Sequence, residues 1–468
     1  MRKPVDAAAG ARPTAGRGKA GARTEPVSER RRREVLGALR RGTVPRSGLD
    51  VLAVGLERFE LAIDAELAAV VGGGSVFKAV RGEYGAGKTF FTRWLAERGK
   101  RLGMATAEVQ ISETETPLHR LETVYRRICD NLATAEFPPS ALRPVLDAWI
   151  FQLEEDVLAA GQVAETDADA LDGAVSELME RRLGVIARSA PTFAAAVRGY
   201  RTATAGADLP TAEGLAGWLG GQPNVAAAVR RAAGVKGELD HFGALGFLQG
   251  LLTVLRGCGH PGLLVVLDEV ETLQRMRSDV RDKALNALRQ LIDEVDGGRF
   301  PGLYLVTTGT PAFFDGHQGA QRLPPLAQRL ATDFSAEARF DNPRAVQLRL
   351  PGFTADGLRE LGRRVRDIFH TPGAAGDRVA ALVDDGYIDL LADRVTGQLG
   401  GRVGVAPRIF LKKLVVDVLD RVELYEDFDP RRDYPVTLAA GELTEVERNV
   451  AGLAVRGVDD IDIDVGLP

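Results

Sequence analysis

The chain of 468 residues has little cysteine and histidine, and it has no apolar run long enough to cross a lipid bilayer. Its two cysteines, Cys129 and Cys258, cannot by themselves form a disulfide framework or a zinc site with four ligands. The five histidines stand singly along the sequence, which argues against a histidine-based metal centre. Because the start of the chain has no apolar stretch of the signal-peptide type, we expect a cytoplasmic protein without a membrane partner.

An excess of charge of one sign is also missing. The chain carries 60 basic and 65 acidic residues, a formal net charge of -5, which argues against a protein that coats nucleic acid but leaves room for a local basic groove. Lysine is scarce, with nine in the chain, and arginine makes up the rest of the basic residues. A single arginine is therefore weakly informative by type, whereas a lysine at a motif position is informative.

The first 33 residues differ in composition from the rest. Residues 1–33 hold ten basic and three acidic residues and almost no large apolar side chains. Such a segment buries too little apolar surface to offset the entropy of ordering, so we expect a disordered basic tail. A solvated tail and a transient contact with phosphates or a partner are both compatible with this composition.

Hydrophobic patterning divides the remaining chain into four kinds of segment. An α/β pattern covers 34–116 and resumes at 241–350, with short apolar runs that predict strands and amphipathic helices between them. An alanine-rich, mostly helical insertion at 117–240 interrupts this core. An all-helical segment at 351–428 follows, and 429–468 form a C-terminal extension. We therefore expect an α/β core with a parallel sheet, a large helical insertion and a C-terminal helical lid.

The strongest motif lies between an expected strand at 76–80 and an expected helix at 88–98. It fits the pattern G-x-x-x-x-G-K-[ST] of the phosphate-binding P-loop and consists of Gly82, Glu83, Tyr84, Gly85, Ala86, Gly87, Lys88 and Thr89. Glycines let backbone N–H groups surround phosphates, and the following helix adds its N-terminal dipole. We expect Lys88 to reach the β- and γ-phosphates of ATP and Thr89 to bind Mg²⁺; an ordinary glycine-rich turn is the alternative.

A second motif follows the apolar run Leu263–Leu267, which has the composition of a parallel strand buried on both faces. Asp268 comes directly after this run and is expected to hold Mg²⁺. Glu269 is expected to orient and polarise the attacking water, a role that favours an ATP hydrolase over a nucleotide kinase. An exposed strand end explains an Asp-Glu pair equally well when no P-loop precedes it.

Several weaker candidates complete the predicted site. Thr308 follows the expected strand at 303–307 and is expected to sense the γ-phosphate, although it could simply cap the strand. Arg329 is expected to act across a subunit boundary, as in ring-forming ATPases. Arg408 begins a helix of the expected lid, where it could close over the phosphates, and a surface ion pair is the alternative for both arginines. Arg41 and Gly42 are expected near the base of the bound nucleotide.

The order of these segments is similar to one known family. It resembles the ATP-binding protein of BREX-type bacteriophage-exclusion systems over about 35–425, through RGTVP at 41–45, VRGEYGAGKTFF at 80–91, VLDEVETL at 266–273 and GTPAFF at 309–314. The resemblance implies an AAA+-like ATPase, laid out like origin-recognition ATPases, with a role in phage defence. It also implies a homo-oligomer or hetero-assembly that works beside a helicase or other defence proteins, with DNA as a possible partner.

Three functions are compatible with these features. The first is a Mg²⁺-dependent ATPase of phage defence, with ATP and Mg²⁺ as cofactors. The second is a switch or scaffold that binds ATP and turns it over slowly. The third is a DNA-binding module regulated by ATP, for which the basic stretch around Arg402, Arg408, Lys412 and Lys413 is the candidate surface, unless these residues form a solvated helix face.

Overall fold

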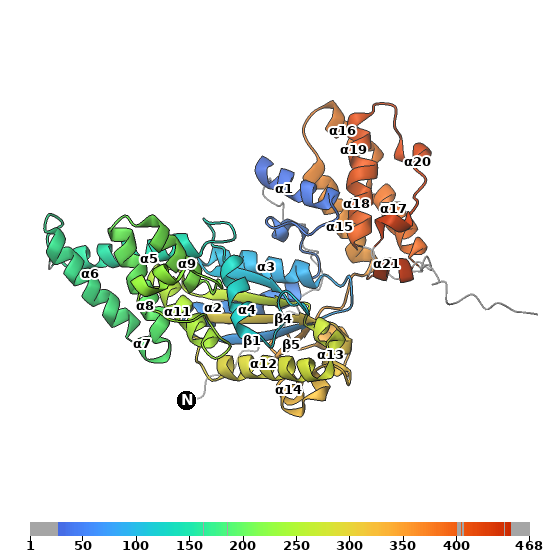
Figure 1. Cartoon of the computed structure of the whole chain (residues 1–468). Coiled ribbons are helices and arrows are strands. Elements are labelled where there is room, and N and C mark those ends of the chain that lie inside the picture. The colour runs from blue at the N-terminus through green and yellow to red at the C-terminus, as the bar shows by residue number, and fades with distance from the viewer. Residues whose placement is uncertain are drawn as a thin grey trace, which may run out of the picture.

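The computed structural model describes residues 27–161, 163–184, 186–399, 404, 407–443 and 445–450. Most of the expected basic tail and Arg402 lie outside these residues. Figure 1 shows a central sheet with flanking helices, an insertion at one end and a separate group of C-terminal helices at the other.

One five-stranded sheet forms the centre of the core. Its strands lie in the order β2-β3-β4-β1-β5, and each neighbouring pair is parallel. The strands are β1 (Val76–Arg81), β2 (Ala105–Gln110), β3 (Leu263–Asp268), β4 (Leu303–Gly309) and β5 (Gln347–Arg349). The expected α/β class with a parallel sheet is confirmed. Because all strands run the same way, their carboxyl ends meet at one edge of the sheet.

Both faces of the sheet are covered by helices. Leu264 and Val266 of β3 join a hydrophobic cluster with α2 (Glu57–Val71) and α3 (Lys88–Arg101). The alternate residues of β3, Leu263, Val265 and Leu267, join a larger cluster that contains α12 (Ser278–Asp296). This alternation follows from the two-residue period of a strand, and burial on both faces explains why the strand is apolar throughout.

The insertion is helical, as expected, and shares the larger cluster with the sheet. Trp149 is fully buried against α11 (Ala244–Gly257), where a Cβ on Gly257 would lie 2.3 Å from the indole nitrogen. Glycine at this position therefore permits the close approach of the tryptophan. The helices of this region are α4 (Leu121–Asp130), α5 (Leu142–Ala159), α6 (Ala168–Leu183), α7 (Ile186–Ser189), α8 (Pro191–Ala205), α9 (Leu209–Leu219), α10 (Ala227–Ala232) and α11 (Ala244–Gly257).

Two segments depart from the elements expected after β4. The glycine- and proline-rich sequence of 309–325 predicts a loop, but the region contains α13 (Pro311–Asp315), the 3₁₀-helix η3 (Ala320–Arg322) and the start of α14 (Pro324–Arg329). Both α-helices begin with proline, which is favoured in the first helical turn because its missing N–H has no helical partner there. The strand β5 was not expected, because three residues carry no measurable alternation.

The C-terminal helices form a bundle with a hydrophobic core of its own. Its described members are α15 (Ala355–Phe369), α16 (Ala374–Leu382), α17 (Asp385–Gln398), α18 (Pro407–Lys412), the π-helix η6 (Lys413–Leu419), α19 (Asp420–Leu424), α20 (Pro430–Asp433), the 3₁₀-helix η7 (Ala440–Glu442) and α21 (Glu445–Val450). We call this group the helical bundle. Figure 1 shows it apart from the insertion.

Helix α1 (Glu29–Arg40) belongs to the core of the helical bundle, although it is close to the start of the chain. The side chains of Val35, Leu36 and Leu39 are buried in that core. This differs from the expected division, which placed residues 34–40 with the α/β core. Residues 29–33, expected in the tail, are helical instead, since Ser28 accepts a hydrogen bond from the Arg31 N–H and caps the helix.

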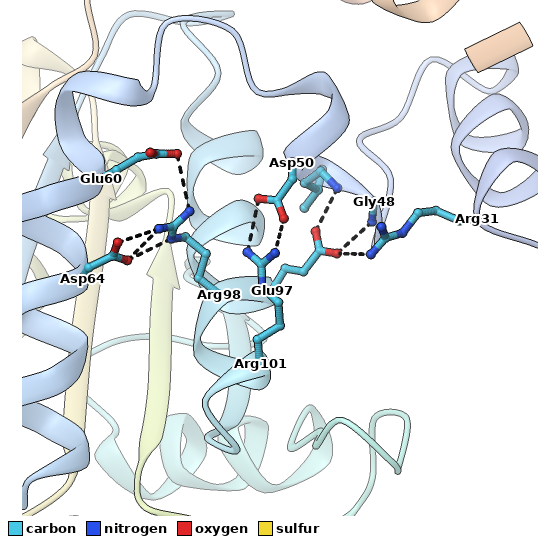
Figure 2. Close-up of polar contacts among 9 residues, drawn as sticks. Arg31, Gly48, Asp50, Glu60, Asp64, Glu97, Arg98 and Arg101 are labelled. Atoms are coloured by element: carbon cyan, nitrogen blue, oxygen red, sulfur yellow. Dashed lines mark hydrogen bonds and ion pairs between the residues drawn. The ribbon is translucent and has the colours of Figure 1, made fainter. Parts of the chain in front are cut away.

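A polar network fastens the start of the chain to the α/β core (Figure 2). The Glu97 carboxylate on α3 accepts hydrogen bonds from the backbone N–H groups of Gly48 (3.0 Å) and Leu49 (2.8 Å), at the start of the 3₁₀-helix η1 (Leu49–Leu52). It also pairs with Arg31 of α1 at 3.2 Å. One partly buried carboxylate therefore links α1, η1 and α3.

Candidate active site

The P-loop connects β1 to α3 in the predicted order. Gly85 (φ 81°) and Gly87 (φ 87°) have left-handed backbone conformations, which side chains with a Cβ rarely adopt, so the two glycines shape the loop. Lys88 is the first residue of α3, and its amine donates hydrogen bonds to the backbone oxygens of Gly82 (2.9 Å) and Glu83 (3.4 Å). The lysine therefore folds back over its own loop.

The carboxyl end of β3 faces the P-loop. The Thr89 hydroxyl lies 3.4 Å from Asp268 Oδ2, although 179 residues separate the two in sequence. On the neighbouring strand, the fully buried Thr308 hydroxyl donates to Asp268 Oδ1. The predicted residues Lys88, Thr89, Asp268 and Thr308 are thus brought to one edge of the sheet.

Glu269 adopts a left-handed backbone conformation (φ 61°), which is unusual for a residue that is not glycine. Its N–H donates to Asp268 Oδ1 and to Thr308 Oγ1, each at 3.1 Å, and these bonds hold the turn. Such a conformation costs about 1–3 kcal/mol and persists where surrounding contacts enforce it. The strand therefore ends in a turn held by hydrogen bonds, and the side chains of Asp268 and Glu269 point in different directions.

Sequence reasoning missed a residue that contacts Glu269. Gln110, the last residue of β2, donates a hydrogen bond of 2.9 Å from its side-chain amide to Glu269 Oε2. The register explains the encounter, since Gln110 pairs with Asp268 in the sheet. A polar residue at the end of a strand was the signal that could have indicated it.

A cavity of about 320 Å³ lies between the P-loop and the helical bundle. Gly42 and Arg408 line it, as do Lys88 and Thr89, whereas Arg41 is exposed and does not line it. The remaining wall is mostly apolar, a composition suited to a flat heterocycle. Pro45, expected beside Arg41 and Gly42, is part of this wall. Sequence reasoning missed the other apolar residues, which include Leu39, Val44, Leu52, Phe90, Phe353, Leu361 and Leu411.

Arg408 is engaged by the C-terminal segment. Its guanidinium donates to the Glu447 carboxylate and, at 2.7 Å, to the backbone oxygen of Glu442. Lys413 is buried and pairs with Asp417 and Glu442. Two of the four residues expected on a DNA-binding face are thus neutralised within the protein.

Arg329 lies on α14 and does not line the cavity. Its guanidinium pairs with Asp293 of α12 and donates to the backbone oxygen of Pro325 at 2.7 Å. Asp293 also pairs with Arg289 at 2.6 Å. The action of Arg329 on a neighbouring subunit stays a prediction.

A buried acid beside the lysine was also missed. Glu271 belongs to the 3₁₀-helix η2 (Val270–Arg275), is 6% exposed, and has its carboxylate 3.8 Å from the Lys88 amine. Burial raises the pKa of the Glu271 carboxyl, and the nearby Lys88 charge opposes this increase. The third acidic residue of the Asp268-Glu269-Val270-Glu271 run was the available signal.

The oxygen atoms of Thr89 and Asp268 suit a hard cation such as Mg²⁺, which prefers oxygen ligands and keeps several water ligands. Within the described part of the chain, no cluster of three or more histidine, cysteine, aspartate or glutamate residues forms a metal cage. A site with two protein oxygens is compatible with Mg²⁺ that is also held by phosphates.

One comparison with known proteins agrees with the P-loop geometry, because it identifies a family of ATP-binding proteins. The family model described as "BREX system ATP-binding protein BrxC/D" matches residues 27–437. No curated protein and no solved structure matches the chain. Among the described helices, none has the length and apolar character needed to traverse a membrane. The match covers most of the chain, which therefore belongs to the BrxC/D family of BREX system ATP-binding proteins.

Proposed function

We propose that this protein is a Mg²⁺-dependent, AAA+-like ATPase of a BREX-type phage-defence system. The observation that carries the proposal is the hydrogen-bonded group of Asp268, Glu269 and Thr308, which faces Thr89 of the P-loop at the edge of the sheet. Nucleotide kinases need no carboxylate to activate water, whereas an ATP hydrolase does. The helical bundle that borders the cavity supports the role of a lid.

The proposed roles follow from the position of each group. The backbone N–H groups of the P-loop and the Lys88 amine bind the phosphates, and Thr89 and Asp268 hold Mg²⁺. When bound, Mg²⁺ neutralises charge on the phosphate oxygens. Glu269 accepts a proton from, or orients, the attacking water, while its backbone turn is held by Thr308. Thr308 thus positions the two acids in addition to any direct contact with the γ-phosphate.

The proposed roles of the arginines require movement or assembly. Arg408 borders the cavity but is paired with Glu447, so it reaches the phosphates after it leaves that carboxylate. Arg329 acts on the site of a neighbouring subunit after it leaves Asp293. Both arginines therefore link hydrolysis to a change in the lid or to assembly.

Phosphate release from ATP tests the proposal. We expect wild-type protein to release phosphate with Mg²⁺, and Glu269→Gln to reduce kcat by roughly 100-fold or more, because a general base contributes at least that factor. Glu269→Gln should leave ATP affinity nearly unchanged, whereas Lys88→Ala should weaken it. Equal turnover by wild type and Glu269→Gln contradicts the assigned base, and no binding of ATP by wild type contradicts the proposal as a whole.

A slow switch is the second candidate, and one observation favours it. The two cations that would bind phosphate are already paired within the protein. Lys88 contacts the Gly82 backbone oxygen and the Glu271 carboxylate, and Arg408 pairs with Glu447. ATP would then lock an assembly, and slow hydrolysis would reset it. Native mass spectrometry with ATP, with ADP and without nucleotide discriminates between the candidates, because ATP-dependent assembly with very slow turnover favours the switch.

The proposed partners follow from the family. We propose cytoplasmic action in an oligomer or hetero-assembly with a helicase or other defence proteins, with DNA contacted directly or through them. Co-purification with Glu269→Gln, which traps ATP, identifies the partners. If the protein itself binds duplex DNA, affinity should fall steeply with salt, and deletion of residues 1–33 shows whether the basic tail takes part.

A further inference from the structure

Glu271 is a buried acid to which the proposed mechanism assigns no role. Its residue is 6% exposed, and among the described residues no other residue donates a hydrogen bond to either carboxylate oxygen. The backbone N–H of Glu271 itself has a small favourable effect on the carboxylate. A buried carboxylate without hydrogen bonds is costly, and such groups are normally satisfied. The presence of a buried carboxylate beside the P-loop therefore needs an explanation.

The nearest opposite charge is the P-loop lysine. The Lys88 amine lies 3.8 Å from Glu271 Oε1, and both side chains are almost fully buried, at 10% and 7% exposure. The Tyr84 ring covers the amine, with its centroid 5.1 Å away. Asp268 and Glu269 are acids that act unfavourably on the Glu271 carboxylate, so among these charged groups Lys88 is the one that stabilises it.

The same amine is the one that nucleotide phosphates need. In the structure it is shared among the backbone oxygens of Gly82 and Glu83 and the Glu271 carboxylate. When the amine turns to a β- or γ-phosphate, Glu271 loses its nearest positive charge and faces additional negative charge. Like charges at such distances repel strongly in a buried setting. Phosphate binding and the ion pair with Glu271 therefore oppose each other.

We propose that Glu271 is a positioning residue that competes with nucleotide phosphates for the Lys88 amine and thereby weakens the binding of nucleoside triphosphates. This inference rests on the proposed function, because it assumes that ATP binds at the P-loop. Its consequence is that the site exchanges nucleotide faster than the P-loop alone would allow. Removal of the carboxylate should retain nucleotide for longer.

Equilibrium binding measured without turnover tests this inference. We expect Glu271→Gln to bind ATP about tenfold more tightly, with a smaller gain for ADP and none for AMP, since AMP has no β- or γ-phosphate. A merely structural role would not produce this dependence on phosphate number. Glu271→Met, which also removes the charge and suits a buried position, should give the same order of affinities if Glu271→Gln is poorly folded.

Two further variants make the comparison specific. Glu66→Gln removes the partly buried acid of another ion pair, in which Glu66 lies 2.6 Å from the buried Lys78 amine, so it controls for the loss of a carboxylate paired with a buried lysine elsewhere. It should leave nucleotide affinity unchanged. In the background of Lys88→Met, Glu271→Gln should lose most of its effect, because the two residues act through each other.

The outcomes separate the inference from the proposed function. If wild type binds ATP and both Glu271 variants bind it with unchanged or weaker affinity, the inference is overturned while the ATP site stands. An effect of equal size for AMP and ATP, or a full effect without Lys88, also overturns it. If wild type fails to bind ATP while it remains folded, the proposed function itself fails.

Discussion

Gln110 holds the carboxylate of Glu269 from the outermost strand of the sheet, with 2.9 Å between the amide nitrogen and Oε2. The proposed base is therefore fixed at both ends, by Gln110 at its side chain and by Asp268 and Thr308 at its backbone N–H. A base held in this way keeps its direction before substrate arrives. Such positioning contributes to the rate of hydrolysis, because even a small misplacement of a catalytic group lowers the reaction rate.

Loss of the Gln110 amide should therefore reduce turnover and spare binding. We expect Gln110→Ala to lower kcat of ATP hydrolysis about three- to tenfold, with little change in the ATP dissociation constant, since Gln110 lies outside the phosphate-binding loop. Steady-state phosphate release together with equilibrium binding separates the two effects.

A matched control exists in the insertion. Gln152 donates a hydrogen bond of 2.8 Å to Asp156, the same kind of bond on a helix away from the cavity. Gln152→Ala should leave kcat unchanged. A weaker ATP affinity with unchanged kcat in Gln110→Ala would assign Gln110 to binding instead of to the orientation of Glu269.

The pairing of Arg408 with Glu447 predicts that the C-terminal segment restrains Arg408 at the edge of the cavity. We expect Glu447→Gln to raise the ATPase rate about two- to fivefold, because a neutral amide holds the guanidinium less strongly than a carboxylate. This gain should disappear in Arg408→Ala/Glu447→Gln. Glu426→Gln, which changes an exposed acid of the bundle, is the control and should leave the ATPase rate unchanged. A rise in ATPase rate that persists in Arg408→Ala/Glu447→Gln would show that Glu447 acts through another group.

The network in Figure 2 predicts a difference between Glu97, on α3, and Glu60, an acid of α2 that pairs with Arg98 of α3. Glu97→Gln should lower the free energy of unfolding by about 1.5–3 kcal/mol, the range of hydrogen bonds to a charged group, because two buried N–H groups depend on its carboxylate. Glu60→Gln should cost less than about 1 kcal/mol, since its contact with Arg98 is long and partly exposed. Thermal or denaturant unfolding measures both, and equal losses would contradict the assigned role of Glu97.

The burial of Glu271 predicts how stability depends on pH. Its pKa is raised above the usual value of 4.5, so just above that pH the folded protein binds more protons than the unfolded chain. The contribution of Glu271 to stability should therefore fall as pH rises from about 4.5 through the raised pKa. The melting temperature of wild type minus that of Glu271→Gln should decrease over this window. A difference that is constant or that rises with pH would contradict the prediction.

The core could be predicted because its signals are local. The P-loop, the apolar run before Asp268 and the strand before Thr308 each combine a residue pattern with a strand end, and parallel strands place such ends together. The α/β class and the approximate positions of β1 to β4 follow from the same patterns. The encounter of Thr89 with Asp268 follows from this topology, whereas its 3.4 Å separation does not.

The remainder depends on contacts between distant segments. Nothing local in Glu29–Arg40 indicates that α1 packs with helices more than 300 residues away, because an amphipathic face is indifferent to its partner. Gln110 and Glu271 matter through neighbours that only the sheet register brings to them. The pairing of Arg408 with Glu447 likewise joins two residues for which sequence gives no reason to meet.

The position of α1 in the helical bundle means that the chain passes between bundle and sheet twice, once between α1 and α2 and once between β5 and α15. A rigid body attached at two points turns most readily about the line that joins them. Both connections border the cavity, the first through Gly42 to Pro45 and the second through Phe353. We expect rotation of the bundle about this axis to change the width of the cavity, which would couple the angle of the bundle to the occupancy of the cavity.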